Sequence, residues 1–171
     1  MDEVDVMFSL TAESLQHVFE RDLRILYDGE QQIVDIFPKI IRNASVAELR
    51  QSMDGHLKMN RQHIARLEKI FQQLHIKMSR RSCRGIRGIL GEIDLIPPRD
   101  KKGVIDARIL GVMVKLEHYQ SGAYEMLRAL ADLLGKPEIA ALLEQTLEEE
   151  KRACSALIGM VRRLNVGARA A

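Results

Sequence analysis

The sequence predicts an all-α fold, a four-helix bundle made of two antiparallel helical hairpins with one long connection between them. Two observations carry this prediction. Apolar residues recur at helical spacing in four long segments, and only a short break separates the two segments of each pair. Tryptophan is absent and aromatic residues make up only 4% of the chain, so the core must rest on aliphatic side chains and methionine, which suit helix packing.

The first hairpin is predicted from residues 11–74. Apolar residues from Leu15 to Ile40 form one stripe in a helix over residues 11–43, and Pro38 is expected to kink this helix or shift its last turns. Ser45 and Glu48 have the spacing of a capping box, which predicts the start of a second helix that runs to about residue 74.

The next stretch, residues 75–103, differs in composition from its neighbours. It holds most of the local basic excess, several glycines and the Pro97-Pro98 pair, and a short helix is expected over residues 82–93. A connection this long can cross the length of a bundle, whereas a simple up-down-up-down bundle needs a short one at this point. The order of helices and connections therefore predicts a ferritin-like topology with a long crossover that contains a short helix.

The second hairpin is predicted from two helices, over residues 103–134 and 137–164. Gly135-Lys136-Pro137 separates them, with glycine after the end of one helix and proline in the first turn of the next. We expect residues 1–165 to form a single domain and residues 166–171 to be a frayed tail.

Charge and hydropathy exclude several classes of protein. The chain has 26 basic and 24 acidic residues, and the resulting net charge of +2 does not predict nucleic-acid binding. The basic residues from Arg80 to Arg87 are interpreted as a solvated loop, with a protein-docking surface as the alternative. No apolar run approaches the roughly 20 residues of a membrane-spanning helix, and the acidic start does not resemble a signal peptide. We therefore expect a cytoplasmic protein that does not bind membranes.

Polar side chains interrupt each apolar stripe near its middle. In an antiparallel hairpin, residues at equal distances from the turn lie beside each other. Counted in this way, the interrupting residues fall at a similar height along the bundle axis, which predicts one polar layer. A buried carboxylate without a partner costs several kcal/mol or becomes neutral, so such a layer needs an explanation. The interrupting residues are Glu30 in the first helix, His56, Asn60 and His63 in the second, Glu117 and Gln120 in the third, and Thr146, Glu149 and Glu150 in the fourth.

Two explanations remain open. Carboxylates and imidazoles that project inward from four helices are the ligands of di-iron and di-manganese sites. A hydrogen-bonded layer that fixes the helix register is the alternative. The candidate metal ligands are Glu30, His56, His63, Glu117, Gln120, Glu149 and Glu150, and no catalytic residue is assigned. Cys154, one turn after Glu150, is interpreted as a small buried residue, with a redox thiol as the alternative.

Several motifs resemble a known family over residues 15–164. The motifs are Asp22-Leu23-Arg24-Ile25-Leu26-Tyr27-Asp28-Gly29-Glu30, Gly55-His56-Leu57, Glu117-His118-Tyr119 and Thr146-Leu147-Glu148-Glu149-Glu150-Lys151. In this order and spacing they are similar to the YciE/YciF-like family of bacterial ferritin-like proteins. The resemblance implies a dimeric, stress-associated ferritin-like bundle without an assigned catalytic activity. It also implies two-metal ligand positions at Glu30, Met59, His63, Glu117, Gln120, Glu150 and Cys154.

Three of these positions depart from the family's usual carboxylates. Met59, Gln120 and Cys154 offer a thioether, an amide and a thiol, none of which is a hard anionic ligand for iron or manganese. The sequence therefore predicts a protein without turnover whose metal site is degenerate or weak. The alternative is a mono- or dinuclear iron or manganese centre that oxidises ferrous iron or consumes peroxide.

Overall fold

The computed structural model describes residues 11–97 and 100–164, and these residues form five helices and no strand. The helices are α1 (Ala12–Asn43), α2 (Ala47–Gln73), α3 (Arg84–Asp94), α4 (Lys102–Leu133) and α5 (Pro137–Leu164). The predicted all-α class is confirmed, and each predicted helix boundary lies within two residues of the observed one. The predicted tail, residues 166–171, lies outside the described residues.

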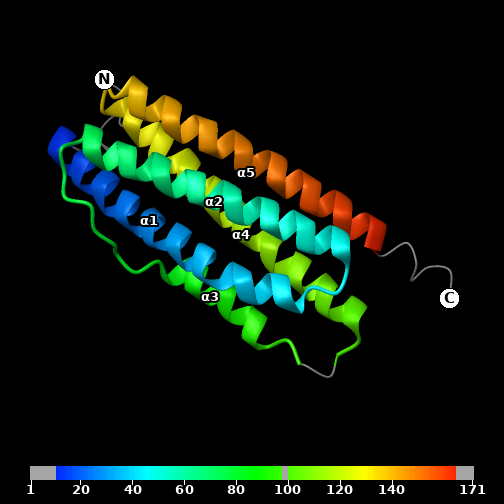
Figure 1. Ribbon diagram of the computed structural model, residues 1–171. Helices are drawn as coiled ribbons and strands as arrows, with labels where there is room; N and C mark the ends of the chain where they lie inside the picture. Colours follow the sequence, from blue (N-terminus) through cyan, green and yellow to red (C-terminus); the bar gives the residue numbers. More distant parts are fainter. Residues whose placement is uncertain (1–10, 98–99, 165–171) are drawn as a thin grey trace, which may run out of the picture.

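Four long helices lie side by side, and the short α3 packs outside them (Figure 1). α1 packs against α2, and α4 packs against α5; α1 also contacts α4, and α2 contacts α5. The chain leaves α2 and runs back along α1, where the backbone N–H of Arg81 donates to the carbonyl of Arg24. α3 then packs on α1 and α4. No helix in the described ranges is long and apolar enough to cross a membrane.

Local signals explain most helix ends. The Thr11 side chain accepts a hydrogen bond of 3.1 Å from the backbone N–H of Ser14, which caps α1. α1 continues through Pro38 to Asn43, so the proline does not end the helix. Gly135 has a φ of 65° and follows α4, and Pro137 begins α5, as the sequence predicts.

The predicted capping box at the start of α2 is wrong. The residue that precedes the helix is Val46, which makes no side-chain cap. The Ser45 backbone N–H donates to Asp106 Oδ1 at 2.7 Å, and the Ser45 hydroxyl donates to Asp106 Oδ2. Glu48 instead pairs with Arg163 of α5 at 2.6 Å. Ser45 bonds to the buried Asp106 carboxylate in place of the backbone of α2, because a charge-assisted hydrogen bond is stronger than one between neutral groups.

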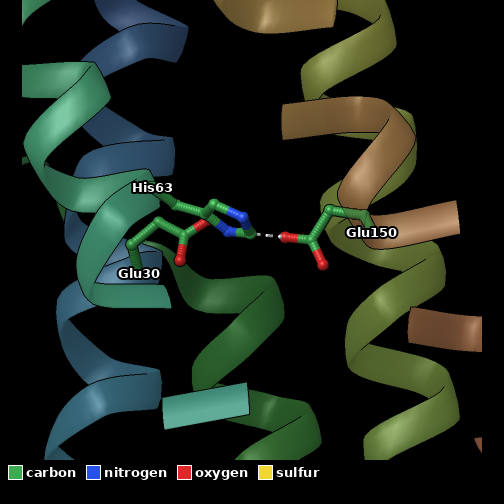
Figure 2. Close-up of side chains that lie close together, drawn as sticks. All are labelled: Glu30, His63 and Glu150. Carbon is green, nitrogen blue, oxygen red and sulfur yellow. Dashed lines mark ion pairs between the residues drawn. The ribbon is translucent and has the colours of Figure 1, made fainter. Parts of the chain in front are cut away.

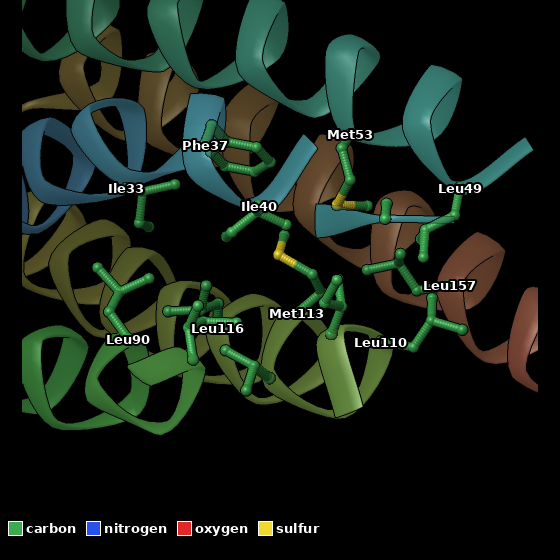
Figure 3. Packing of buried hydrophobic residues seen from close by; sticks show 14 of the residues in the cluster. Ile33, Phe37, Ile40, Leu49, Met53, Leu90, Leu110, Met113, Leu116 and Leu157 are labelled. Carbon is green, nitrogen blue, oxygen red and sulfur yellow. The ribbon is translucent and has the colours of Figure 1, made fainter. Parts of the chain in front are cut away.

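Two apolar clusters fill the core on either side of the middle of the helices. One gathers Ile40, Met53, Met113 and Leu157 with their neighbours (Figure 3). The other gathers side chains from the opposite half, among them Phe19 and Leu143. Both clusters contain residues of α1, α2, α4 and α5, so each cluster holds all four long helices together.

The start of α3 is fixed by close contacts with α1 and α4. Asp28 of α1 accepts hydrogen bonds from the backbone N–H of Cys83 at 2.8 Å and from Arg80 Nε at 2.8 Å. Burial alone would raise the pKa of Asp28, but these hydrogen bonds and the charge of Arg80 lower it. Gly85 lies so close to Tyr119 that a Cβ atom there would be 2.3 Å from the tyrosine ring.

We therefore predict that Gly85→Ala destabilises the protein by about 1–3 kcal/mol, because overpacking forces the Tyr119 ring to move. Urea denaturation would measure the free energy of unfolding. Gly88→Ala is the matched control in the same helix, since a Cβ atom there meets nothing within 4 Å. The control should be neutral or stabilising by up to about 1 kcal/mol. Equal effects of both substitutions would contradict the close packing of Gly85.

Candidate functional site

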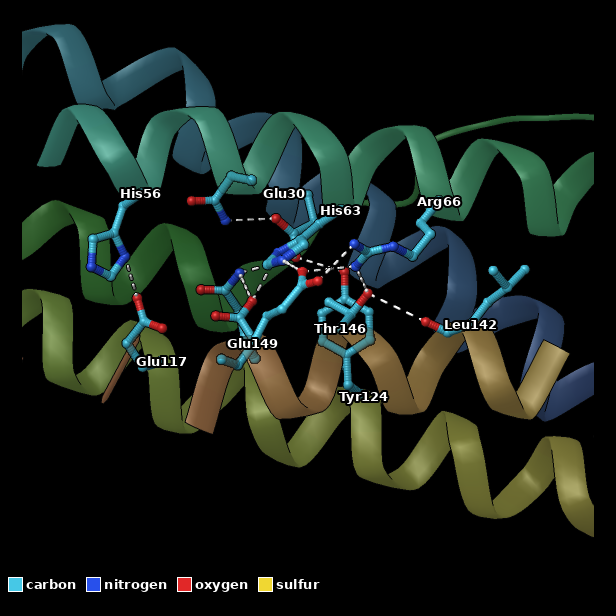
Figure 4. A network of polar contacts seen from close by, with 12 residues as sticks. Glu30, His56, His63, Arg66, Glu117, Tyr124, Leu142, Thr146 and Glu149 are labelled. Carbon is cyan, nitrogen blue, oxygen red and sulfur yellow. Dashed lines mark hydrogen bonds and ion pairs between the residues drawn. The ribbon is translucent and has the colours of Figure 1, made fainter. Parts of the chain in front are cut away.

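A layer of buried polar side chains lies between the two apolar clusters, and all four long helices contribute to it. It consists of Glu30, Asn60, His63, Gln120, Tyr124 and Glu150, and none of these residues is more than 3% exposed. We call this set the polar layer (Figure 4). The predicted mid-helix layer is thus present in the structure, although its exact membership differs from the predicted one.

Glu30 is the centre of the hydrogen bonding in the polar layer. Its Oε2 accepts from Asn60 Nδ2 at 2.9 Å, and its Oε1 accepts from Gln120 Nε2 at 3.0 Å and from the Tyr124 hydroxyl at 2.8 Å. Burial, together with the charges of Glu30 and Glu150, raises the pKa of Tyr124 well above its usual value. The phenol therefore stays protonated and remains a donor to Glu30.

Three potential metal ligands meet beside these hydrogen bonds (Figure 2). Ligand atoms of Glu30, His63 and Glu150 all lie within 4.8 Å of one another. His63 Nδ1 is 3.2 Å from Glu150 Oε1 and 3.8 Å from Glu30 Oε1. Burial and the charges of Glu117 and Glu30 raise the pKa of Glu150 well above its usual value. Negative potential therefore accumulates where these side chains meet.

The chemistry of these three donors fits one divalent cation. Two carboxylates and one neutral imidazole would balance a charge of +2, and both ligand types suit iron, manganese and zinc. Neither His63 Nδ1 nor Glu150 Oε2 has a hydrogen-bond partner in the described part of the chain. Buried polar atoms without partners are uncommon, and a cation among them would satisfy both.

Glu149 and Arg66 orient the imidazole from the other side. His63 Nε2 lies 3.0 Å from Glu149 Oε2, and Arg66 forms two hydrogen bonds of 2.9 Å with the same carboxylate. Burial alone would raise the pKa of Glu149, but the hydrogen bonds and charge of Arg66, with those of His63, lower it. With the proton on Nε2 donated to Glu149, His63 Nδ1 presents its lone pair to Glu30 and Glu150.

His56 and Glu117 form a separate pair on the side of the layer away from Arg66 (Figure 4). His56 Nδ1 is 3.2 Å from Glu117 Oε1, but the contact lacks hydrogen-bond geometry. Glu117 Oε2 also lacks a partner among the residues described. Both side chains are buried, and the His56 ring stacks on Phe37.

The structure thus divides the candidate ligands into three sets. Glu30, His63 and Glu150 meet, Gln120 and Glu149 contact that group through hydrogen bonds, and His56 pairs with Glu117, whose charge acts on Glu150 from outside the group. The sequence did not single out Arg66, although it lies three residues after His63 and so shares its side of α2. Met59 is only half-buried and is outside the polar layer.

Comparisons with known proteins agree on one family. The model of the family described as Domain of unknown function (DUF892) matches residues 14–169. Protein YciF of Escherichia coli (strain K12) is 31% identical over 144 residues, which cover 83% of this chain and 87% of YciF.

Two solved structures are also similar. The crystal structure of the E. coli stress protein YciF has a TM-score of 0.84 at 29% identity, and the match covers 89% of this chain and 97% of YciF. YcfI from Rhodopseudomonas palustris, a proposed structural protein, has a TM-score of 0.80 at 34% identity. That match covers 88% of this chain and 97% of YcfI.

Removal of the Tyr124 hydroxyl tests the hydrogen bonding of Glu30. We predict that Tyr124→Phe in metal-free protein lowers the free energy of unfolding by about 1.5–3 kcal/mol, because a buried carboxylate loses a donor. Tyr27→Phe is the matched control, since Tyr27 donates at 2.9 Å to the part-exposed Glu68, which water can also solvate. Urea denaturation should show a smaller loss for the control. A larger loss in the control would contradict the central role of Glu30.

Proposed function

The chain belongs to the DUF892 family, and from this premise we propose that it is a ferritin-like bundle protein that binds one divalent cation without turnover. The two packed hairpins and the long connection that carries α3 support the ferritin-like topology. The E. coli relative is described as a stress protein, which supports a stress-associated role. The R. palustris relative is described as a proposed structural protein, which supports a role without catalysis.

One observation carries the metal-binding part of this proposal. Glu30, His63 and Glu150 are fully buried, come from three different helices and bring their ligand atoms within 4.8 Å of one another. In the part of the chain that the structure describes, they form the one such group of three or more. A cation would stabilise the two neighbouring carboxylates, whose charges otherwise repel each other in a poorly solvated site.

The surrounding side chains favour one cation over two. Di-iron bundles use about four glutamates and two histidines around two ions. Here Gln120 donates from Nε2 to both Glu30 and Glu150, at 3.0 and 2.9 Å, so an N–H group occupies the space between the carboxylates. Arg66 neutralises Glu149, the nearest additional carboxylate. The positions of Met59 and Cys154 supply no carboxylate.

The residues of the layer would hold the ion and restrict it. An iron or manganese ion, when bound, would supply Lewis acidity and access to one-electron chemistry. Glu149 fixes the His63 ring, and Tyr124 and Gln120 hold the Glu30 carboxylate. The apolar clusters on both sides of the layer limit access of water and substrate. This arrangement is suited to retention of an ion more than to exchange of reactants.

We predict one ion per chain in protein purified from cells supplemented with iron and manganese. Glu150→Gln should weaken binding by more than about tenfold, because even loss of an indirect ligand contact typically costs that much. Metal analysis and a chelator titration would measure stoichiometry and affinity. Glu148→Gln is the matched control, since Glu148 is a partly exposed neighbour on α5 that pairs with Lys151. Two tightly bound ions per chain would overturn the proposal.

A second candidate function is an iron or manganese enzyme that oxidises ferrous iron or consumes peroxide. The carboxylate oxygens Glu117 Oε2 and Glu150 Oε2 favour it, because both are buried without partners among the described residues. They could serve a second, weaker ion.

Ferrous iron oxidation separates the two candidates. Under the main proposal, the wild-type protein should oxidise ferrous iron no faster than Glu30→Ala, because a single enclosed ion does not turn over. Stopped-flow absorbance of the ferric product would measure both rates. Wild-type oxidation that is faster by about tenfold or more, about 1.4 kcal/mol in the barrier, would favour the enzyme.

We also propose that the protein is a cytoplasmic homodimer that does not bind nucleic acid. Met126 and Leu133 support self-association, because both are exposed and their spacing of seven residues places them on one face of α4, where a second copy could cover them together. The balanced net charge supports the absence of nucleic-acid binding. Light scattering with a size-exclusion column would measure the mass in solution.

A further inference from the structure

One side of α4 faces away from the bundle and is exposed from its first turn to its last. α4 contacts α1, α3 and α5, and residues that recur at a spacing of three, four or seven share its remaining side. Three of the large exposed apolar side chains in the described part of the chain lie there. We call the exposed residues of this side the α4 face: Val104, Arg108, Gly111, Lys115, His118, Gly122, Met126 and Leu133.

One end of the α4 face forms a groove with the chain that follows α3. The groove has a volume of about 480 Å³, and its lining includes Leu95, Ile96, Arg108, Gly111, Val112 and Lys115. Leu95 is 73% exposed, so water contacts an apolar wall of the groove. Exposed apolar surface with a polar rim is typical of an interaction site, and here the polar rim carries two positive charges.

The other end of the α4 face carries protruding apolar side chains beside acidic ones. Met126 and Leu133 are 52% and 71% exposed and stand seven residues apart. Each directly follows an exposed acidic residue, which is Glu125 in one case and Asp132 in the other. The two ends of one helix therefore differ in both shape and charge: a basic groove at one end, and acidic protrusions at the other.

The charges of the two ends match when two copies of α4 lie antiparallel. One register brings Glu125 of one copy level with Lys115 of the other. The same register brings Asp132 level with Arg108, because the two acidic residues and the two basic residues are each seven apart. Arg108 and Lys115 already pair with acidic residues of their own chain, but exposed ion pairs contribute little and rearrange easily.

The apolar side chains match in the same register. Met126 and Leu133 of one copy then come level with residues 107–114 of the other, which include the part of α4 that lines the groove. The two side chains would cover Leu95 and the floor of the groove, and the two-fold symmetry would repeat this contact at the other end. Apolar surface of both copies would thus leave water together.

Two glycines of the α4 face support a close approach by another helix. A glycine within a helix costs about 0.5–1 kcal/mol relative to alanine. A Cβ atom at Gly111 or Gly122 would meet nothing within 4 Å, so packing inside the described part of the chain does not require glycine at either position. A second helix would require it, because the missing side chains let two backbones come close together.

We propose that the α4 face is the surface on which a second copy of this chain docks, with the two α4 helices antiparallel. Met126 and Leu133 of each copy cover the groove of the other, and the acidic residues beside them lie next to Arg108 and Lys115. This inference rests on the homodimer of the proposed function and assigns its contact surface. Because the pairing is isologous, both copies use the same surface and the assembly closes at two.

Leu133→Glu tests the apolar contact, because it places a charge against the apolar surface of the second copy. Sedimentation equilibrium should show that the dissociation constant of the dimer rises by more than about tenfold. Met78→Glu is the matched control, since Met78 is 49% exposed but lies outside the α4 face, between α2 and α3. Circular dichroism would verify that both variants fold. A dimer of unchanged affinity in Leu133→Glu would overturn the interface.

Charge reversal tests the antiparallel register. Glu125→Lys/Asp132→Lys and Arg108→Glu/Lys115→Glu should each dimerise more than about tenfold more weakly, because like charges then lie level. An equimolar mixture of the two variants should form mixed dimers, since every level pair again joins opposite charges. Native mass spectrometry would count them.

The exposed basic residues of α2 supply the matched control for the charge reversal. Lys58→Glu/Arg61→Glu removes the same number of positive charges outside the α4 face and should dimerise like the wild type. A mixture of the two α4 variants that stays monomeric would overturn the register.

These measurements separate this inference from the proposed function. A dimer that no α4 variant weakens leaves the homodimer intact and overturns the α4 interface alone. A wild-type protein that is monomeric at every concentration overturns the homodimer and the interface together, whereas the number of ions per chain is measured independently of both.

The same variants bear on the metal centre only indirectly. All substituted residues of the α4 face are exposed, and none belongs to the polar layer, so each variant should bind as many ions per chain as the wild type.

Discussion

The buried carboxylate of Glu30 is the constraint on which the packing of the long helices depends. A carboxylate in an apolar core is tolerated only when donors surround it, and here the donors come from α2 and α4. A shift of either helix by one residue would carry Asn60, Gln120 or Tyr124 away from Glu30 and leave the charge without a partner. The apolar clusters on both sides supply most of the stabilising free energy, but they could tolerate such shifts more easily. Glu30 therefore contributes register more than net stability.

The helices could be predicted from the sequence because their signals are local. Apolar spacing, Thr11 and Gly135-Lys136-Pro137 act over one or two turns, and the observed helices follow them. Contacts between distant residues escaped prediction for the opposite reason. Ser45 bonds to Asp106 instead of forming the predicted capping box, and Arg66 of α2 pairs with Glu149 of α5. Neither pairing leaves a signal in local sequence spacing. Counting residues from the hairpin turns predicted the layer, but the method is too coarse to separate His56 and Glu117 from the ligands that meet.

The polar layer also explains how a family resemblance can hold for the fold and change at the site. Two side chains change the local balance of charge. Gln120, where the resemblance implies a carboxylate, donates from its amide to Glu30 and Glu150, and Arg66 neutralises Glu149. His63 compensates in part, because its imidazole meets Glu30 and Glu150 from the face of α2 that is buried. The same topology therefore supports a site with fewer negative charges, and the fold alone does not determine the chemistry.

Register and metal binding place compatible demands on the same side chains. Both oxygens of Glu30 accept hydrogen bonds, although Oε2 accepts only one, whereas Glu150 Oε2 and His63 Nδ1 have no partner among the described residues. The first arrangement fixes the helices before any ion binds, and the second leaves free ligand atoms at a fixed place. An ion that binds only the folded chain would then add its binding free energy to stability without any change in the packing. A small, retained cation requires a layer whose side chains are held in place but whose ligand atoms are not all hydrogen-bonded. Glu30 takes part in both functions of the layer, because it fixes the helix register and is also a candidate ligand.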